Sequence, residues 1–376
     1  MELVEREPRD DFSGLRVAVI HDWLTGMRGG ERVLEAIVDL FPSAEIFTLF
    51  HFEGSVSSAI ESHRIHVSPL QPAASRVRNY RLLLPFYPAA LAAWDFSRFD
   101  LLVSSSHCVA KGAAATGVPH VSYCHTPMRY VWDRFDDYFP PRKPLLRLAG
   151  STLAPALRRW DVATAAGVDR FIANSSFVSD RIRRFYQREA DVVHPFVDPA
   201  FFRVPVQEER GDFHLLVSAL VPYKKVELAI EAAALEGFRL VIAGGGPLLE
   251  TLRKDAPENV RLTGKVTEEE LIGLMGEARS LLIPGVEDFG IVALEAMALG
   301  TPVIARALGG VADSVIGGET GILMEQEGAE AIVDAVREVE ARDWNRSSLR
   351  SRAMEFSRTR FQEGIAGVIR QVLRKP

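Results

Sequence analysis

Two glutamates eight positions apart carry the clearest chemical signal in this sequence. Glu287 stands in a loop directly before a predicted helix over residues 291–299, and Glu295 lies about one turn inside that helix. The rest of the helix is apolar, so a carboxylate buried there is costly unless a partner satisfies it. Because the first amides of a helix have no partner within it, two acceptors and several donors converge on one small volume. This combination suits a polyhydroxylated, negatively charged ligand; a helix cap beside one satisfied core glutamate is the alternative.

The residues that flank these glutamates complete a motif. Residues 281–283 form a predicted strand end, the helix closes at Gly300, a short strand covers residues 302–305, and Gly309 and Gly310 follow. Spacing, strands and glycines together resemble the signature of the retaining nucleotide-sugar glycosyltransferases of family 4, which have the GT-B fold. The resemblance extends over nearly the whole chain. It implies an α/β fold with two Rossmann-like, doubly wound parallel-sheet domains that face a central cleft.

The same resemblance implies roles for the residues of the motif. Glu287 would hold hydroxyls of the transferred sugar, and Glu295 would hold the ribose hydroxyls of the nucleotide. The remaining donor contacts of this segment come from the loop and the helix start: Asp288, Phe289, Gly290 and Ile291.

Length and composition set the frame for these residues. A chain of 376 residues predicts two domains of roughly 150 to 200 residues. The family resemblance implies an acceptor-binding domain over residues 1–200, a donor-binding domain over residues 201–357, and a last helix, about residues 358–376, that returns to the first domain. The acidic, polar start shows no signal peptide, and no apolar run is long enough to span a bilayer, so we expect a cytoplasmic protein. Two cysteines, Cys108 and Cys124, make neither a disulfide framework nor a metal site.

The first domain opens with a nucleotide-binding pattern. A buried strand over residues 15–20 leads into a loop with Gly29 and Gly30 and then a helix over residues 31–40. The glycines let a ligand approach the backbone where the helix starts. The loop lacks the GxGxxG spacing of nicotinamide and flavin dinucleotide sites. The family resemblance implies that Gly29 and Gly30 face the donor diphosphate.

A histidine follows another predicted strand of the first domain. The strand over residues 118–124 delivers His125 at its C-terminal end, where open α/β sheets bind ligands. A structural histidine is the alternative. The resemblance implies that His125 contacts the donor sugar near the reacting carbon. The motifs HDWL and CHTPMRYVWD also resemble a subgroup of mannosyl- and deoxyhexosyl-transferases of surface polysaccharides, and four residues within them are the predicted acceptor contacts: Asp22, Trp23, Arg129 and Tyr130.

Two lysines mark the start of the second domain. A strand over residues 213–220 precedes a predicted helix over residues 224–235, and Lys224 and Lys225 at its start oppose the helix dipole unless an anion lies there. The resemblance implies that Lys224 holds the diphosphate. At the position where the family usually has a diphosphate-binding arginine stands Ala219, so Lys225 or Arg28 would have to compensate.

Further loops of the second domain complete the predicted donor site. A strand over residues 238–243 runs into a glycine cluster, and the segment after the next strand matches the part of the family that borders the base. The residues concerned are Gly244, Gly245, Gly264, Lys265 and Val266. Thr267 and Glu270 have the spacing of a capping box for the next helix.

Basic charge is concentrated in one part of this acidic chain. The net charge is −6, but residues 62–159 hold 13 Lys and Arg against 5 Asp and Glu. Residues 70–98, with Arg76, Arg78 and Arg81, and residues 141–160 mix cationic and apolar side chains. Such segments can lie in an anionic membrane interface; core-packing helices with solvated arginines are the alternative. No nucleic-acid motif accompanies the charge.

These features lead to one mechanism with two competitors. We expect a retaining hexosyltransferase in which Lys224 and loop amides stabilise the departing diphosphate and His125 orients the sugar. No DxD-like motif stands at a strand end, so we predict no metal and no cofactor. GDP-mannose is the favoured donor, by subgroup resemblance, and a lipid-linked saccharide acceptor would account for the basic, apolar segments. A noncatalytic sugar-nucleotide-binding scaffold, favoured by Ala219, and a sugar-nucleotide epimerase of the same fold are the alternatives.

Overall fold

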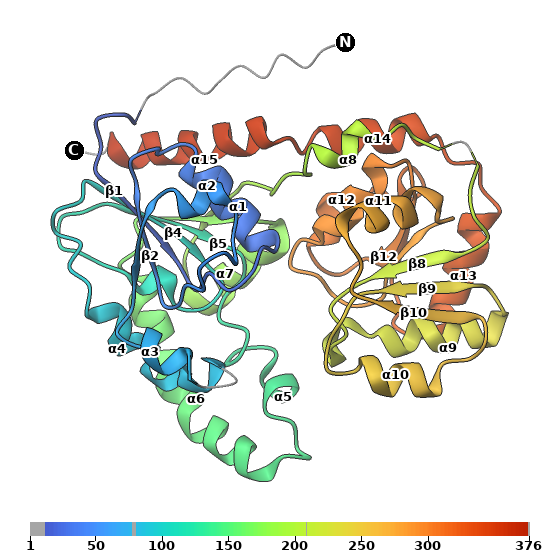
Figure 1. Ribbon diagram of the computed structural model, residues 1–376, viewed down its shortest axis with the longest axis horizontal. Helices are drawn as coiled ribbons and strands as arrows, with labels where there is room; N and C mark the ends of the chain where they lie inside the picture. The colour runs from blue at the N-terminus through green and yellow to red at the C-terminus, as the bar shows by residue number, and fades with distance from the viewer. Residues whose placement is uncertain (1–11, 77–79, 208, 375–376) are drawn as a thin grey trace. The chain divides into compact units, whose positions relative to one another are not determined.

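The computed structural model describes residues 12–76, 80–207 and 209–374, and every structural statement below concerns these residues. Two compact units make up the chain (Figure 1). Unit 1 contains the described residues up to His194 and those from Thr359 onward, and unit 2 is Pro195–Arg358. The division thus falls a few residues before the predicted boundary at residues 200 and 201.

Unit 1 is built on a parallel sheet of seven strands in the order β3-β2-β1-β4-β5-β6-β7. The strands are β1 (Val17–His21), β2 (Glu45–Thr48), β3 (Arg64–Val67), β4 (Leu101–Ser106), β5 (His120–Cys124), β6 (Arg170–Ala173) and β7 (Ala190–Val192). The helices are α1 (Gly29–Val38), α2 (Ser58–Glu61), α3 (Gln71–Ala74), η1 (Tyr80–Phe86), α4 (Tyr87–Ala92), η2 (Ala110–Gly112), α5 (Phe135–Tyr138), α6 (Pro144–Ala165), α7 (Ser176–Tyr186) and α15 (Arg358–Leu373).

Unit 2 repeats the plan with six parallel strands in the order β10-β9-β8-β11-β12-β13. The strands are β8 (His214–Val217), β9 (Leu240–Ala243), β10 (Val260–Gly264), β11 (Leu281–Ile283), β12 (Val303–Arg306) and β13 (Gly321–Met324). The helices are α8 (Ala200–Arg203), η3 (Pro222–Lys224), α9 (Val226–Glu236), α10 (Leu249–Asp255), α11 (Glu268–Glu277), α12 (Ile291–Ala298), η4 (Gly310–Asp313), α13 (Ala329–Glu340) and α14 (Arg346–Met354).

Both sheets follow from continuous apolar runs. All residues of β1, β4 and β5 are buried, as expected for central parallel strands that are covered on both faces. In unit 2, two separate apolar clusters pack on the sheet, one centred on α12 and the other on α9 and α13. Strand order reverses between β1 and β4 and again between β8 and β11. Ligands of open α/β sheets bind beyond the carboxyl ends of the strands at such switch points.

Local sequence signals were mostly confirmed. Thr267 and Glu270 form the predicted capping box of α11. The last helix packs on unit 1: the ring of Phe361 lies 5.5 Å from that of Tyr123, and Gln362 donates to the carbonyl of Ala36. No helix in the described ranges combines the length and the apolar character needed to cross a membrane.

The helix after β8 starts two residues after its approximate predicted position. We expected it at residue 224, but Lys224 ends the short helix η3 and α9 begins at Val226. Lys225 separates the two helices, because its left-handed conformation, with φ of 55°, breaks the helical path.

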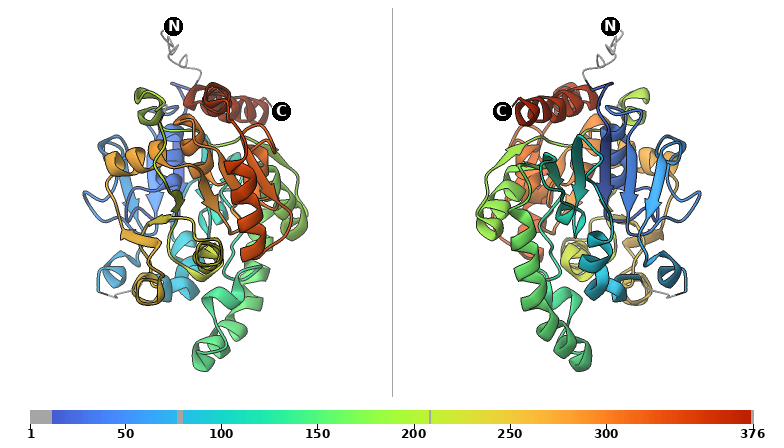
Figure 2. Two further views of the ribbon diagram at one scale, coloured as in Figure 1. Left: turned by 90° about the vertical axis from the view of Figure 1, so that its right-hand side faces the viewer. Right: turned by 90° about the vertical axis from the view of Figure 1, so that its left-hand side faces the viewer.

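Helix α6 differs from the other helices of unit 1 in its exposure. Figure 1 and both views of Figure 2 show its first turns extending beyond the sheet. Leu145 and Leu148 there are 83% and 64% exposed. Most of the buried residues of α6 lie further along the helix, where Ala154 and Leu157 contribute to the core.

Candidate active site

Three histidines gather at the carboxyl edge of the unit 1 sheet. His21 ends β1, His107 follows β4 and His125 follows β5, so all three lie at or next to the switch point. The ring centroid of His107 lies 6.3 Å from that of His21 and 6.3 Å from that of His125. Sequence reasoning singled out only His125. The other two stand at strand ends in the same way, which is the signal that could have identified them.

A serine joins two of these rings. Ser105 Oγ lies 2.8 Å from His125 Nε2 and 3.1 Å from His21 Nδ1. The main chain of His125 is fixed as well, because its N–H donates to the carbonyl of Ser106 and its carbonyl accepts from the Asn174 side chain. His125 is therefore held rigidly through both its ring and its backbone.

Burial keeps the imidazoles of His107 and His125 neutral. It lowers the pKa of His125 well below the ordinary value, and the nearby charges of His107, His21 and Arg129 act in the same direction. Burial also lowers the pKa of His107, although the carboxylate of Asp22 opposes the shift. At neutral pH the rings of His107 and His125 then each have one N–H donor and one bare acceptor nitrogen.

The helix that follows β1 starts against this cluster. Helix α1 begins at Gly29, and a Cβ added to Gly30 would lie 3.8 Å from His21 Cε1 and 3.9 Å from His125 Nε2. The two predicted glycines thus lie beside the histidines, at a helix N-terminus. Glu31 in the first turn is buried, with its carboxylate 3.9 Å from His21 Nε2.

Asp22 has a structural position that its prediction as an acceptor contact did not foresee. Its carboxylate is fully buried and accepts hydrogen bonds of 2.7 to 2.9 Å from four consecutive amides, those of His107, Cys108, Val109 and Ala110. It also faces His107 Nδ1 at 3.1 Å. Asp22 therefore anchors the loop after β4, and its oxygens are already used by the protein.

Burial also argues against two other predicted acceptor contacts. Trp23 is 3% exposed and Tyr130 is 8% exposed, and both side chains belong to the aromatic core beneath β1 and β4. Arg129 is half-buried, so among the four it is the residue that keeps a reachable side chain. The acceptor role of Arg129 stays a prediction.

In unit 2, the two predicted catalytic residues meet across the switch point. Lys224 follows β8 and Glu287 follows β11, and Lys224 Nζ donates to Glu287 Oε1. Both side chains are 18% exposed, so the pair is partly shielded and still reachable. The structure thus brings a cation and a carboxylate together at the carboxyl edge of the unit 2 sheet.

The loop that carries Glu287 packs tightly on a second loop. Gly290 has φ of 81°, and a Cβ there would lie 2.5 Å from Val311 Cγ2. A Cβ on Gly310 would lie 2.0 Å from the carbonyl oxygen of Asp288, and the Gly310 amide donates to the carbonyl of Glu287. Only glycine fits this close approach, which explains why both glycines accompany the glutamate in the motif.

The remaining predicted donor contacts near Glu287 differ in how deeply their side chains are buried. Phe289 is 4% exposed and belongs to the core, so only its main chain can serve a ligand. Ile291 opens α12, and Glu295 lies in the same helix, half-buried.

The glycine loops after β9 and β10 lie side by side. The amide of Gly244 donates to the carbonyl of Gly264, and a Cβ on Gly245 would lie 3.1 Å from Lys265 Cγ. Lys265 is exposed and Val266 packs against the α12 cluster. The structure therefore brings this predicted group together at the carboxyl edge of the unit 2 sheet.

A second charged cluster at this edge was not predicted. Lys225 Nζ lies 3.3 Å from Glu327 Oε1, and Arg306 Nη1 donates to Glu327 Oε2 at 3.0 Å. Arg306 is only 11% exposed at its side chain, and its buried Nε has no hydrogen-bond partner among the described residues. Arg306 ends β12, and that strand-end position is the signal that could have revealed it.

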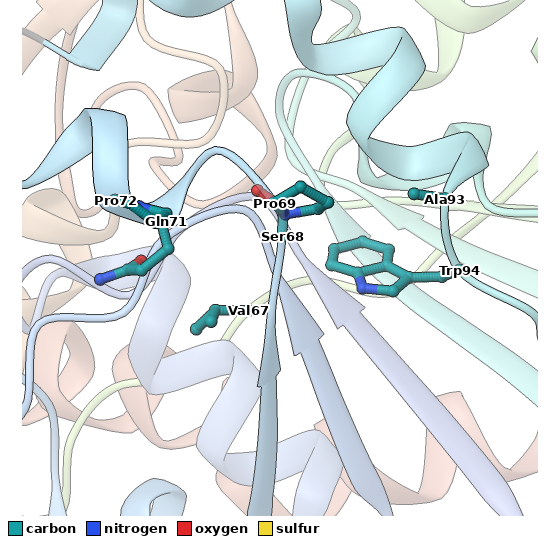
Figure 3. A pocket seen from close by; sticks show the side chains of 7 residues that line it. All are labelled: Val67, Ser68, Pro69, Gln71, Pro72, Ala93 and Trp94. Atoms are coloured by element: carbon teal, nitrogen blue, oxygen red, sulfur yellow. The ribbon is translucent and has the colours of Figure 1, made fainter.

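The surface holds a pocket elsewhere. It measures about 480 Å³ and lies at the end of β3 (Figure 3). Its lining is mostly apolar and consists of Val67, Ser68, Pro69, Gln71, Pro72, Ala93 and Trp94. None of the predicted site residues lines it. Over the described part of the chain, no group of three or more His, Cys, Asp or Glu side chains is placed to hold a metal ion.

Family models match both halves of the chain. The model described as Glycosyltransferase Family 4 matches residues 27–201, and the model described as Glycosyl transferases group 1 matches residues 198–358. The chain is 37% identical over 141 residues to a GDP-mannose-dependent alpha-(1-6)-phosphatidylinositol monomannoside mannosyltransferase of Mycobacterium tuberculosis, which covers 33% of this chain and 37% of the relative. It is 29% identical over 299 residues to a D-inositol 3-phosphate glycosyltransferase of Streptomyces avermitilis, covering 68% and 61%. In both cases the match spans less than two thirds of the relative's length.

A solved structure with the same architecture is that of Anabaena HepE in complex with UDP. Its TM-score is 0.68 at 16% identity, and the superposition covers 95% of this chain and all of that one. At this identity the likeness shows the fold alone, which is the GT-B arrangement of two parallel-sheet α/β units. With both halves matched by family models and this fold, the chain belongs to glycosyltransferase family 4.

Proposed function

We propose that the protein is a retaining hexosyltransferase that moves mannose or a deoxyhexose from a nucleotide diphosphate sugar to a saccharide acceptor. The observation that carries the proposal is the Lys224–Glu287 pair at the switch point of unit 2. A cation for phosphate and a carboxylate for sugar hydroxyls lie within one hydrogen bond there. Family membership supports the transfer of a glycosyl group.

The proposed step breaks the bond between the anomeric carbon and the diphosphate oxygen, and it forms a bond from that carbon to an acceptor hydroxyl oxygen, whose proton is released. Negative charge grows on the departing diphosphate, and Lys224 stabilises it. Glu287 accepts from hydroxyls of the sugar, Glu295 from those of the ribose, and His125 orients the sugar. No step of this scheme uses a metal ion or a cofactor.

A GDP-linked donor is favoured over other bases. The support is the Mycobacterium tuberculosis relative, which is GDP-mannose-dependent by name and 37% identical over the matched segment. The same relative acts on a phosphatidylinositol mannoside, which supports a lipid-linked acceptor for this chain. Such an acceptor places the reaction at the cytoplasmic face of a membrane in surface-polysaccharide assembly.

A noncatalytic donor-binding scaffold is the competing proposal. Its support is Ala219, which leaves the usual arginine of the diphosphate site absent. Lys225 and Arg306 supply two cations at the same sheet edge, although Glu327 neutralises one of them. Turnover of the donor separates the enzyme from the scaffold.

A ligand screen with melting temperature as its readout tests the proposal. GDP, UDP, ADP, dTDP and their common sugar conjugates are added with and without EDTA. Since a ligand that binds only the folded state stabilises by RT ln(1 + [L]/Kd), one present at 100 Kd adds about 2.7 kcal/mol. We expect the guanine nucleotides to raise the melting temperature, EDTA to leave the shift unchanged, and Glu295→Gln to abolish it.

The control variant is Glu258→Gln, which changes an exposed glutamate of unit 2 outside the site. It should keep the full response. If no nucleotide shifts the melting temperature, the donor site is wrong. If one does, but the sugar nucleotide is never consumed with any saccharide or water as acceptor, the scaffold replaces the enzyme.

A further inference from the structure

We infer that a chain of buried side chains, Glu31, His21 and Ser105, fixes which nitrogen of His125 carries the proton. These three are then positioning residues for the transfer, and their effect on turnover rests on the proposed function. The chain leaves His125 Nδ1 with a lone pair, so that this nitrogen accepts a hydrogen bond from a hydroxyl of the sugar.

The four side chains lie in a row in the order Glu31, His21, Ser105 and His125. Glu31 Oε1 lies 3.9 Å from His21 Nε2, His21 Nδ1 lies 3.1 Å from Ser105 Oγ, and Ser105 Oγ lies 2.8 Å from His125 Nε2. His21 is 1% exposed, Ser105 is fully buried and Glu31 is 4% exposed. Because water is excluded from these side chains, each proton in the line is placed by its protein neighbours.

The Glu31 carboxylate determines which nitrogen of His21 carries the proton. Burial favours the neutral acid, but contact with His21 outweighs it and lowers the net pKa of Glu31, so the carboxylate is ionised at neutral pH. A position in the first turn of α1 also favours the charged form. His21 Nε2 is buried, has no hydrogen-bond partner among the described residues and lies 3.9 Å from this charge. A bare lone pair there would be repelled, so Nε2 carries the proton of His21.

Through Ser105, the position of the proton on His21 determines its position on His125. With its proton on Nε2, His21 has an acceptor at Nδ1, which requires the hydroxyl proton of Ser105. Ser105 has only one proton, so its oxygen can only accept from His125, and His125 must carry its proton on Nε2. The opposite arrangement would put a lone pair of His21 against the Glu31 carboxylate.

The free nitrogen of His125 is then the useful one. Nδ1 forms no hydrogen bond to any described residue, and His125 is half-buried and not sealed from solvent. Burial keeps the ring neutral, so that Nδ1 remains an acceptor over the ordinary working range of pH. A neutral acceptor orients a sugar hydroxyl without placing a positive charge beside a developing oxocarbenium carbon.

Two variants and a matched control test the chain. Glu31→Gln replaces the carboxylate with an amide that can turn either its N–H or its oxygen toward His21 Nε2, so the proton of His125 is no longer confined to Nε2. Ser105→Ala removes the link. The control is Ser104→Ala on the same strand: Ser104 is equally buried and lies 2.8 Å from the ring of His120, but it does not contact His125.

The first readout is the tautomer of His125 in protein with nitrogen-15-labelled histidine. Two-bond proton–nitrogen couplings separate the two tautomers, and the signals that vanish in His125→Gln identify the residue. We expect an Nε2–H tautomer in the wild type and in Ser104→Ala, and a mixture of the Nε2–H and Nδ1–H tautomers in Glu31→Gln. An Nδ1–H tautomer in the wild type would overturn the inference, as would a Glu31→Gln protein that leaves it unchanged.

The second readout is kinetic. In Glu31→Gln and Ser105→Ala we expect kcat to fall about tenfold, the effect of one misdirected hydrogen bond, with little change in the KM for the donor. Equal kcat values in the wild type and both variants would remove the positioning role. The NMR experiment needs no substrate, so it stands even if transfer is never observed, and failure of the proposed function can be told apart from failure of the chain.

Discussion

At the scale of single residues, burial decides which of the conspicuous carboxylates can serve a ligand. Glu287 is 18% exposed and its partner is a flexible lysine, so both can turn toward a substrate. Asp22 has no exposure, and its partners are four main-chain amides that cannot move away. The two residues look alike in sequence, each following a buried strand beside a glycine-containing loop, and only the donors around them separate their roles.

Buried histidines also give this protein a defined response to acid. His120 has its pKa lowered to about 3 by burial, and the charge of Lys111 acts in the same direction. The unfolded chain has the ordinary value of about 6.5. Above pH 6.5 the ring is neutral in both states and contributes nothing. Below it, only the unfolded chain binds the proton, so the free energy of unfolding falls by about 1.4 kcal/mol per pH unit until about pH 3.

Replacement of His120 measures its contribution to the pH dependence of the free energy of unfolding. When the pH falls from 6.5 to 5, protonation of His120 in the unfolded chain should lower the free energy of unfolding of the wild type by about 2 kcal/mol. His120→Gln lacks this contribution, so its free energy of unfolding should fall by about 2 kcal/mol less over the same pH range. Urea unfolding followed by tryptophan fluorescence measures this, because four of the five tryptophans lie in unit 1 with His120. If the free energies of unfolding of the two proteins fall equally between pH 6.5 and pH 5, the prediction is contradicted.

At the scale of elements, strand ends were predictable and one helix start was not. Parallel strands follow directly from apolar runs, so the positions of Glu287, Lys224 and His125 after their strands could be found from sequence. The start of α9 could not, because Lys225 adopts a left-handed conformation that propensity assigns to glycine. Such strain persists where surrounding contacts hold it and is frequent at functional sites.

Substituting glycine for Lys225 distinguishes the backbone strain at this residue from its predicted role in donor binding. Lys225→Gly should raise the stability of the protein by up to about 1 kcal/mol, since glycine adopts this conformation without steric cost. It should also weaken donor binding, because one cation of the predicted diphosphate site is lost. Thermal unfolding and nucleotide titration on the same samples measure both effects.

The chain contains a matched control for this prediction. Gln187 at the end of α7 has φ of 54°, the same conformation in unit 1, and no donor residue is predicted beside it. Gln187→Gly should gain similar stability and bind donor as the wild type does. If Lys225→Gly binds the donor equally well, Lys225 is a structural residue only.

At the scale of the whole molecule, the sequence contained the plan of two parallel-sheet units but not the long-range contacts that assign side chains. Domain number and strand pattern follow from length and local signals, and the return of the last helix was implied by the family resemblance. The role of Asp22 does not, because its donors come from residues 85 to 88 positions further along the chain. The link from His21 to His125 through Ser105 is likewise a product of strand order, since β4 lies between β1 and β5.

Charge distribution over the whole chain carries the last prediction. The protein has a net charge of −6, yet residues 62–159 hold 13 Lys and Arg against 5 Asp and Glu. Within that range, Leu145 and Leu148 are exposed on the projecting turns of α6, and Arg142 and Lys143 directly before them are exposed too. Exposed Leu82 and Phe86 lie in the other basic, apolar segment, where Arg76 is exposed, Arg78 lies outside the described residues and the Arg81 side chain is not described. This combination fits an anionic lipid surface.

Vesicle flotation tests whether α6 makes that contact. The protein should float with vesicles that contain anionic lipid, bind neutral vesicles weakly, and be released by salt, because surface charges are screened. Each leucine that enters the interface is worth about 1.5 kcal/mol or more, so Leu145→Ser with Leu148→Ser should reduce binding at least about tenfold. Leu235→Ser is the matched control, since Leu235 is 61% exposed on α9 of unit 2 and lies outside the basic segments of the sequence. Equal binding to neutral and anionic vesicles, or no effect of the double variant, would show that the arginines and leucines of α6 are merely solvated.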